Sequence, residues 1–317
     1  MKTVVLGAGT FGTALANSVH QDLDVILYTV EFDVVEDINQ NRRNSKYFPN
    51  KKLSKNIRAT TQFVDIADSD MAFIAIPSGA VVDFFTQKKF SNNTIIINGS
   101  KGFAKENLLI CQFLENLLPK NPICAIKGPS FASEMIFDIP TSFTIAAKNE
   151  NTYKKITEIL RNDLVVTDWS TDILGVEYVS VVKNVYAIVM GIVDAYYNSP
   201  NVRFLVFTKI LREIRTLMDK MNINKSILYH YCGIGDLGLT SLNDLSRNRT
   251  LGLLIGKGFF DPSYQNNGVL IEGLRALNEI SSKIQGSSKE FPIIYNASLL
   301  LHNQIKVKAF INKIIFG

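Results

Sequence analysis

The chain opens with a strand, a glycine-rich turn and a helix, and this order restricts what it can fold into. Residues 3–19 read TVVLGAGTFGTALANSV, a β-branched run followed by G-x-G-x-x-G and an amphipathic run. Gly7 permits the turn, Gly9 lets the backbone approach a pyrophosphate, and Gly12 lets the helix pack against the strand. Free N–H groups at the helix start would hold the anion. The pattern predicts a dinucleotide-binding βαβ unit.

A second strand supplies the acid that such a unit uses. Residues 24–31, DVILYTVE, end in Glu31, which lies 22 positions beyond Gly9. An acid at this spacing accepts hydrogen bonds from the adenosine ribose. No arginine follows at once to hold a 2′-phosphate, so we expect NADH to be preferred over NADPH. NADP remains possible if Arg42 or Arg43 folds back toward the ribose, and a glycine turn without ligand is the alternative interpretation.

Strands and helices then alternate. Further strands are expected at 71–78, 93–102, 121–130, 141–148 and 164–168, with helices at 79–87, 105–118 and 151–162. This alternation predicts an α/β fold, a Rossmann-like, doubly wound, mostly parallel sheet covered by helices on both faces. Ligands of such sheets bind beyond the carboxyl ends of the strands. We therefore expect Ser78, Lys101, Gly128 and Ser130 to face one crevice.

The pattern changes after Trp169, where strand-like runs stop and helical periodicity continues to the end. With 317 residues, 46% of them hydrophobic, the chain is long enough for two domains. We expect a dinucleotide-binding domain at 1–171 and an all-α domain at 172–317 that binds substrate and carries catalytic residues.

One helix of the second half is apolar except at its middle. Residues 176–193, VEYVSVVKNVYAIVMGIV, place Lys183 and Asn184 there. A lysine at the centre of a bilayer costs about 2.5–3.5 kcal/mol, so a membrane span is not expected. The N-terminal apolar run is too short for a secretory signal. We expect a soluble, cytoplasmic protein without membrane insertion, with Lys183 buried at the cleft between the domains.

Charge and cysteine content narrow the class of partner. The net charge of +5 and a pI near 8.9 favour anionic partners. The densest basic stretch, 41–56, carries no nucleic-acid-binding motif, so we read it as a solvated loop and expect no nucleic acid. Cys111, Cys124 and Cys232 are odd in number and form no C-x-x-C, so neither a disulfide framework nor a metal site is expected.

Two polar segments of the helical half do not fit simple core packing. GIGDLGLT, residues 233–240, sets Asp236 and Thr240 among glycines. In SRNRTLG, residues 246–252, Ser246 would cap a helix whose first turn holds Arg247 and Asn248. The planar fork of arginine and a helix N-terminus both suit a phosphate group.

Eight motifs in order resemble one family across nearly the whole chain. They are GAGTFGTALA, RRNSKYFP, SKGF, KGPSFASE, VKNVYAI, GIGDLGLT, SRNR and LIEG. Their order and spacing are similar to those of the bacterial-type NAD(P)-dependent glycerol-3-phosphate dehydrogenases. The resemblance implies reduction of dihydroxyacetone phosphate to sn-glycerol 3-phosphate by a nicotinamide cofactor, for glycerophospholipid synthesis, and a homodimer.

The resemblance also implies site residues. Lys183 would be the catalytic acid or base, with Lys101 and Asp236 beside the reacting carbonyl. The substrate would also meet Gly128, Ser130, Thr240, Ser246, Arg247 and Asn248. The cofactor site would be lined by Gly7, Gly9, Thr10, Phe11, Gly12, Glu31, Lys101, Ala132, Arg247, Leu270 and Glu272.

A buried amine loses solvation in its charged form, so its pKa falls unless a carboxylate such as Asp236 opposes this. Such a lysine could protonate the oxygen that becomes the alcohol as hydride arrives. The alternative is a lysine with only its stem buried. Where the family has glycines, this chain has Val179, Ser180 and Val181, and YYNSPN at 196–201, so the close approach of that helix to its neighbours is open.

Two other functions stay open on the sequence. A related dehydrogenase of the 3-hydroxyacid or 6-phosphogluconate type also uses a buried Lys-Asn pair, but the cluster at Arg247 argues against it. A catalytically silent NADH-binding redox sensor would not need Lys101, Lys183 and Asp236 together.

Overall fold

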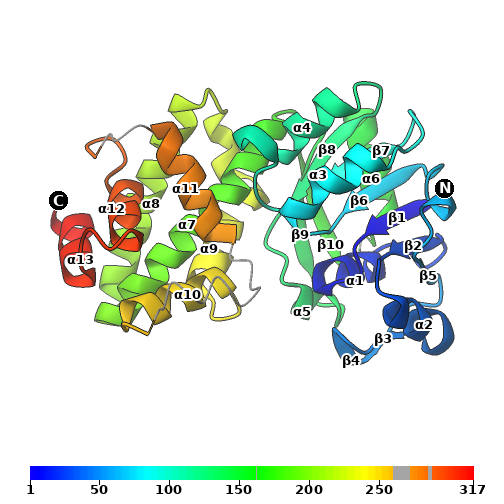
Figure 1. The fold of residues 1–317 in the computed structure, drawn as a ribbon, viewed down its shortest axis with the longest axis horizontal. Coiled ribbons are helices and arrows are strands. Elements are labelled where there is room, and N and C mark those ends of the chain that lie inside the picture. Colours follow the sequence, from blue (N-terminus) through cyan, green and yellow to red (C-terminus); the bar gives the residue numbers. More distant parts are fainter. Residues whose placement is uncertain (162, 260–271, 285–287) are drawn as a thin grey trace. The chain divides into compact units, whose positions relative to one another are not determined.

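The computed structural model describes residues 1–161, 163–259, 272–284 and 288–317. This part of the chain forms two compact units, Met1–Glu177 and Tyr178–Gly317. The boundary expected near residue 171 falls just before helix α7 (Ile173–Tyr197), which begins in the first unit and continues into the second (Figure 1).

The first unit is built on one sheet of eight strands within the described residues. They are β1 (Thr3–Leu6), β2 (Val25–Tyr28), β5 (Ile57–Thr60), β6 (Met71–Ile74), β7 (Ile95–Asn98), β8 (Ile123–Lys127), β9 (Thr141–Ala146) and β10 (Val165–Ser170). The spatial order is β10-β9-β8-β7-β6-β1-β2-β5. Chain order reverses beside β1, between β6 and β2. This reversal marks the crevice where such sheets bind ligands.

All neighbouring strands of this sheet are parallel except β8 and β9, which are antiparallel. The only helix between β8 and β9 is α5 (Ala132–Met135). A parallel crossover needs a dozen or more residues, usually including a helix that spans the sheet, and four helical residues cannot do this. The mostly parallel sheet predicted from the sequence is confirmed, and the reversal at β9 is the exception within it.

Helices cover the sheet as the alternation predicted. They are α1 (Thr10–Asn17), α2 (Phe32–Asn41), α3 (Ser78–Gln87), α4 (Ile110–Leu117), α5 and α6 (Glu150–Ile159), with single 3-10 turns at Phe63–Asp65 and Lys105–Asn107. Strand register aligns Val5, Leu27 and Phe73 across β2, β1 and β6. These side chains pack with Leu15 of α1 and Ile156 of α6 in one apolar cluster. The burial of this cluster fixes the position of the start of α1, and therefore the position of the glycine turn before it.

The stretch 41–56 is more ordered than the solvated loop we expected. It contains a two-stranded hairpin, β3 (Arg43–Asn44) and β4 (Phe48–Lys52). Asn44 and Phe48 are buried. The basic side chains hid this pattern in the sequence, because the strands are short and their outward residues are lysines and arginines.

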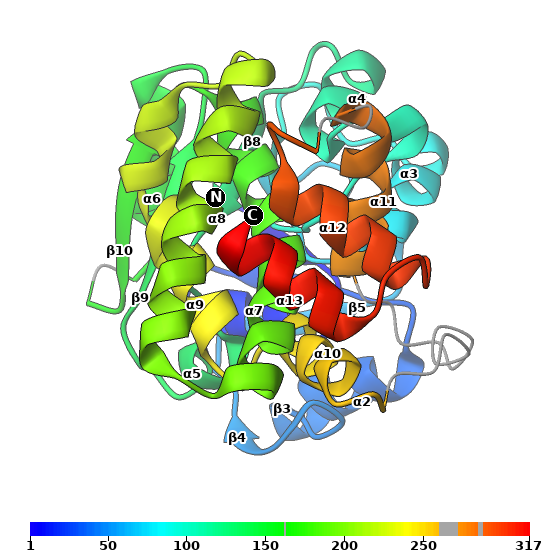
Figure 2. The ribbon, with the colours of Figure 1, turned by 90° about the vertical axis from the view of Figure 1, so that its left-hand side faces the viewer.

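The second unit is helical throughout its described residues. Its helices are the main part of α7, α8 (Pro200–Lys220), α9 (Asp236–Leu242), α10 (Arg247–Gly256), α11 (Glu272–Ile284), α12 (Pro292–Leu301) and α13 (Val307–Phe316), with a 3-10 turn at Lys225–Tyr229 and a π-helical turn at Tyr231–Gly235. Figure 2 shows α12 and α13 side by side, with α8 against them.

Helix α7 is long and apolar enough to cross a membrane by length and composition, but every residue of its most apolar 18-residue window is buried within the protein. It approaches α10 closely at two glycines. A Cβ on Gly252 would lie 2.0 Å from the Ile188 carbonyl oxygen, and one on Gly191 would lie 2.2 Å from the Arg249 oxygen. The sequence did not decide whether this helix approaches its neighbours closely at positions 179–181. The close approach to α10 occurs farther along α7.

Candidate active site

The glycine turn has the geometry expected of a pyrophosphate-binding loop. Gly7 has a positive φ of 106°, and a Cβ there would lie 2.7 Å from the Ala75 oxygen. A Cβ on Gly12 would lie 1.9 Å from the Gly7 oxygen, so both positions exclude a side chain. Gly9, which caps α1, has open space around its Cβ position. The first N–H groups of α1 are therefore reachable by an anion.

Glu31 precedes α2 and is held from the β3–β4 hairpin. The Tyr47 hydroxyl donates to its Oε2 at 3.1 Å, and Lys46 forms an ion pair with its Oε1. The hydrogen bond from Lys46 to this carboxylate raises the pKa of Lys46. Sequence reasoning placed Glu31 but missed both partners, because they lie 15 and 16 residues farther along.

The two arginines that could have turned toward the ribose are engaged elsewhere. Arg42 Nη2 donates to the Leu53 carbonyl at 3.0 Å, and Arg43 Nη1 donates to the Pro49 carbonyl at 3.2 Å. Both contacts lie within residues 41–56, which contain β3 and β4 and which we call the hairpin segment.

The same segment supports the glycine turn. The buried Asn44 amide donates to the Ala8 carbonyl at 2.8 Å and to Thr13 Oγ1 at 2.9 Å. Asn44 was not selected from the sequence. The sequence signal for it is a lone asparagine among the charged residues of the RRNSKYFP motif. A buried amide at such a position is unusual unless it has hydrogen-bond partners.

Lys101 lies in a loop after β7 whose backbone is tied down on both sides. Asn98 Oδ1 accepts from the Ser100 N–H at 2.9 Å, and Ser100 Oγ donates to the Ile76 carbonyl. The buried Lys127 ammonium donates to the Ser100 carbonyl. Lys101 itself is only partly buried, and its side chain makes no hydrogen bond or ion pair with the described residues. The loop therefore presents an available cation.

A buried carboxylate completes this support. Glu177 is fully buried, and its Oε1 accepts from Asn98 Nδ2 at 2.5 Å while its Oε2 accepts from the Cys111 N–H at 3.0 Å. Burial raises the pKa of the Glu177 carboxyl, and the charge of Lys127 opposes that change. Sequence reasoning missed Asn98, Lys127 and Glu177. Asn98 and Lys127 both end strands, which was the available signal.

The residues after β8 serve packing as well as any ligand. A Cβ on Gly128 would lie 2.2 Å from the Ser142 oxygen, so this glycine is required by the neighbouring strand. Ser130 Oγ donates to the Gly128 carbonyl at 3.0 Å. Ala132 begins α5, and Phe11 of α1 packs edge-to-face on Phe143 at 6.5 Å between ring centroids.

In the second unit Lys183 is fully buried and forms an ion pair with Asp236, the first residue of α9. Thr240, one helical turn on, donates to Asp236 Oδ1 at 3.4 Å. A charge pair inside an apolar helix layer carries a large desolvation penalty, so its presence calls for a reason other than stability. The π-helical turn before α9, a feature enriched at functional sites, positions Asp236.

Asn184, the next residue on α7, reaches the start of two further helices. Its Oδ1 accepts from Asn248 Nδ2 of α10 at 3.1 Å, and Asn248 Oδ1 accepts from the Gly273 N–H of α11 at 3.2 Å. Glu272 begins α11, while Leu270 lies outside the described residues. Lys183 and Asn184 thereby join three polar segments of the helical unit.

The start of α10 has the predicted cap. Ser246 Oγ accepts from the Arg249 N–H at 3.3 Å, as the sequence indicated. The two arginines that follow differ: Arg247 is exposed and makes no ion pair with the described residues, whereas Arg249 is buried and pairs with Asp194 at 2.5 Å. Only Arg247 is available to an outside anion.

Residues 2–153 match the family of NAD-dependent glycerol-3-phosphate dehydrogenase N-termini, and residues 172–312 match the C-termini of the same enzymes.

Individual relatives agree with this match. A glycerol-3-phosphate dehydrogenase [NAD(P)+] from Leptospira biflexa is 34% identical, covering 90% of this chain and 85% of the relative. One from Methanothermobacter thermautotrophicus is 32% identical, covering 93% and 91%. The crystal structure of the Coxiella burnetii glycerol-3-phosphate dehydrogenase has a TM-score of 0.90 at 29% identity, covering 99% of this chain and 98% of that one.

Proposed function

The chain belongs to the NAD-dependent glycerol-3-phosphate dehydrogenases, and we propose that Lys183 is the proton donor of its reaction. Members are NAD(P)-dependent oxidoreductases of lipid metabolism that reduce dihydroxyacetone phosphate to glycerol 3-phosphate. The observation that carries the proposal is the buried Lys183–Asp236 ion pair on α7 and α9.

The chemistry requires one proton at one oxygen. A bound nicotinamide coenzyme would supply the hydride for the carbonyl carbon, and the carbonyl oxygen must then gain a proton. Lys183 would donate this proton from Nζ and, in the reverse direction, accept it. Asp236 would hold the amine in place, with Thr240 fixing the carboxylate in turn. We propose that Lys101, in its anchored loop, adds positive charge near the same oxygen.

Substitution at Lys183 tests this role. Lys183→Met keeps the apolar stem, and we expect single-turnover hydride transfer to fall by about 10² to 10⁴. Because this change leaves Asp236 buried without its partner, it should also lower stability by about 3–5 kcal/mol. The double variant Lys183→Met/Asp236→Asn should recover most of that stability without recovering the rate. Near-wild-type turnover in either variant would remove Lys183 from the mechanism.

Lys183→Arg distinguishes proton transfer from a purely electrostatic role. A guanidinium keeps the charge but does not release a proton at working pH. We expect Lys183→Arg to be nearly as slow as Lys183→Met. Recovery of much of the rate would show that charge alone is required.

We propose that the start of α10 holds the substrate phosphate. Arg247 is exposed and pairs with no carboxylate of the described residues. Asn248 donates one amide hydrogen to Asn184, which leaves the other for a ligand, and the helix N-terminus adds N–H donors. Ser246 caps this helix, and Gly128 and Ser130 would meet the substrate from the first unit. Turnover of dihydroxyacetone phosphate should greatly exceed that of dihydroxyacetone, since these donors would be left unpaired without a phosphate. Equal rates would contradict this.

We propose that residues 1–171 form the domain that binds the coenzyme. Gly7, Gly9, Thr10 and Gly12 would hold its pyrophosphate, Phe11, Ala132 and Lys101 would line the nicotinamide side, and Arg247, Leu270 and Glu272 would contribute from residues 172–317.

NADH should be preferred over NADPH. Glu31 carries a negative charge where a 2′-phosphate would lie, its neighbour Lys46 is already paired with it, and Arg42 donates into the hairpin. The test is the ratio of kcat/KM for the two coenzymes in wild type and in Glu31→Gln. We expect a ratio above one that falls in the variant. A higher kcat/KM for NADPH in wild type would reverse the assignment.

We further propose that the protein is a cytoplasmic homodimer. Exposed aromatic residues near the turn between α7 and α8, Tyr196, Tyr197 and Phe204, offer an apolar surface for a second copy. Light scattering after size-exclusion chromatography should give twice the mass of the 35.4 kDa chain. Tyr197→Ser/Phe204→Ser should shift the equilibrium to monomer if this surface is the interface.

A further inference from the structure

A basic cavity lies behind the hairpin segment of the first unit, away from the glycine turn. It measures about 300 Å³ and is lined from three segments of the chain. Asn17 and Gln21 come from the end of α1 and the turn after it, Arg42 and residues 51–55 from the hairpin segment, and Asp138 and Arg161 from the segments before β9 and β10. Its volume is at the lower end of the range for small-molecule sites.

The charges around this cavity are not balanced. The lining holds five cationic side chains, Arg42, Lys51, Lys52, Lys55 and Arg161, against the single carboxylate of Asp138. Asp138 accepts from Lys51 and from Arg161, each at 2.8 Å, and Arg161 also pairs with Asp163, outside the lining, at 3.1 Å. Within the described part of the chain, Lys52 and Lys55 have no ion-pair partner. An anion in the cavity would relieve this repulsion.

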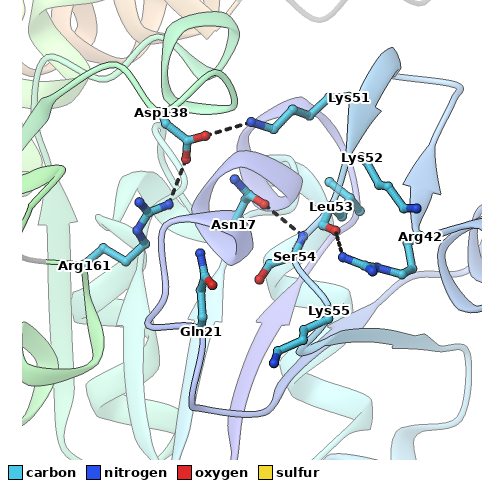
Figure 3. Close-up of a pocket in the computed structure, with 10 residues that line it drawn as sticks. All are labelled: Asn17, Gln21, Arg42, Lys51, Lys52, Leu53, Ser54, Lys55, Asp138 and Arg161. Carbon is cyan, nitrogen blue, oxygen red and sulfur yellow. Dashed lines mark hydrogen bonds and ion pairs between the residues drawn. The ribbon is translucent and has the colours of Figure 1, made fainter.

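Polar groups lie between these cations, and two of them are held by a hydrogen bond within the lining. Asn17 is buried and its Oδ1 accepts from the Ser54 N–H at 3.2 Å, so its amide nitrogen faces away from Ser54 (Figure 3). Figure 3 shows the Gln21 side chain between those of Arg161 and Ser54, with Lys55 extending toward the same space. The set comprises two cations, two amides and a hydroxyl, which is suited to the several acceptor oxygens of a phosphate group.

The cavity is distinct from the coenzyme site. Gly9 caps α1 at its beginning, whereas Asn17 is its last residue. An eight-residue helix is about 12 Å long, so the two sites lie at opposite ends of α1. They are nevertheless joined by the hairpin segment, since Asn44 in that segment holds the Ala8 carbonyl of the glycine turn.

We propose that this cavity is a second anion site, which takes a small molecule bearing one or two phosphate groups. Lys55 and Arg161 bind the phosphate oxygens from either side, and Gln21, Asn17 and Ser54 complete the donor set. The site is separate from the substrate phosphate site proposed at Arg247, and its occupancy does not depend on turnover.

Calorimetric titration of the NADH-saturated enzyme with inorganic phosphate and with pyrophosphate, at constant ionic strength, tests the site. NADH occupies the glycine turn, so two anion sites are expected to remain. Arg247→Gln should remove one of them. Lys52→Gln/Lys55→Gln should weaken the other at least tenfold, while KM for dihydroxyacetone phosphate stays unchanged. Tighter binding of pyrophosphate than phosphate would identify a diphosphate ligand, and the reverse a monophosphate.

The matched control is Lys89→Gln/Lys120→Gln, which removes the same charge at exposed positions of the same unit outside the cavity. It should titrate like wild type. The proposal is overturned if Lys52→Gln/Lys55→Gln also titrates like wild type, or if the control loses as much affinity, because binding would then follow net charge alone. Thermal unfolding of each variant confirms that the titrated protein is folded.

Discussion

Arg247 and Arg249 lie two residues apart on α10, yet the structure gives them opposite surroundings. Arg247 is exposed, while the Arg249 side chain is 8% exposed and pairs with Asp194 on α7 and Asp244. We expect Arg247→Gln to leave the unfolding free energy within about 0.5 kcal/mol of wild type. Its kcat/KM for dihydroxyacetone phosphate should fall by about 10- to 100-fold, because a charge-assisted hydrogen bond is worth about 1.5–3 kcal/mol.

Arg249→Gln should have the reverse effect, with a loss of stability and little change in KM. Removing the guanidinium leaves the buried Asp194 with Arg203 as its one cationic partner among the described residues, and breaking such a pair costs about 3 kcal/mol. KM of the folded fraction should stay near wild type. Steady-state kinetics and thermal unfolding of both variants make the comparison, and a stability loss in Arg247→Gln with none in Arg249→Gln would contradict it.

What the sequence could predict about single residues depends on the range of their contacts. The Ser246 cap is a local rule over three residues, and it was predicted correctly. The partner of Arg249 lies 55 residues away, and the pairing of Glu31 with Lys46 depends on a hairpin that was read as a loop. Such contacts are set by tertiary packing and leave no periodic trace. Lys127 and Glu177 were missed for the same reason.

At the scale of elements, the crossing of α7 and α10 depends on glycine. A Cβ on Gly252 would lie 2.0 Å from the Ile188 oxygen and 2.9 Å from the Gly191 Cα. Both are backbone atoms of α7, so the helices must separate to admit it. We expect Gly252→Ala to lower the unfolding free energy by about 1–3 kcal/mol despite the better helix propensity of alanine. Urea unfolding measures this change.

Gly238 in α9 is the matched control, because it is helical and has no heavy atom within 4 Å of its Cβ position. Gly238→Ala should be neutral or stabilise the protein by up to about 1 kcal/mol. Equal losses at both positions would show that backbone entropy, and not the close crossing, governs these helices.

A buried carboxylate joins α8 to the start of α12. Glu213 accepts from the N–H groups of Ile293 and Ile294 at 2.7 and 2.9 Å and from the Tyr186 hydroxyl at 3.1 Å. Burial raises the pKa of Glu213 to about 7, against the effect of these donors. The folded state then holds this proton between about pH 4.5 and 7, where the unfolded chain has lost it.

The free energy of unfolding should therefore fall by up to about 3 kcal/mol from this group alone as pH rises through this window. Above pH 7 it should level off. Glu213→Gln should remove that part of the slope, and the exposed control Glu158→Gln should keep it. Unfolding midpoints measured at pH 5 and pH 7.5 decide. If the difference in unfolding midpoint between wild type and Glu213→Gln does not change with pH, Glu213 titrates in its ordinary range.

Most of the helices and strands could be predicted from the sequence. Alternating strands and helices predicted the mostly parallel sheet, and the loss of strand-like runs after Trp169 predicted the helical unit. The antiparallel direction of β9 could not be predicted, because a strand has the same hydrophobic pattern in either direction. Its direction follows from the short α5 connection. The hairpin β3–β4 was missed because two- and five-residue strands with basic outward faces give no clear period.

At the scale of the whole molecule, the residues proposed to hold the far ends of the two ligands belong to different compact units. Glu31, in Met1–Glu177, would contact the adenosine ribose, whereas Arg247, in Tyr178–Gly317, would contact the substrate phosphate. Among the described residues, the side-chain hydrogen bonds and the ion pair of Glu31 are made within its own unit. A change at one residue should therefore act on one ligand without disturbing the structure around the other.

This division predicts additive effects on catalysis. Glu31→Gln should raise KM for NADH with little change for dihydroxyacetone phosphate, and Arg247→Gln should raise KM for dihydroxyacetone phosphate more than KM for NADH. Effects of independent sites add to within about 0.5 kcal/mol, so the loss of kcat/KM in the double variant should equal the two single losses combined. Steady-state kinetics with both substrates varied complete the cycle. A coupling energy well above about 1 kcal/mol would show that the two residues act on a common step, because independent sites do not couple this strongly.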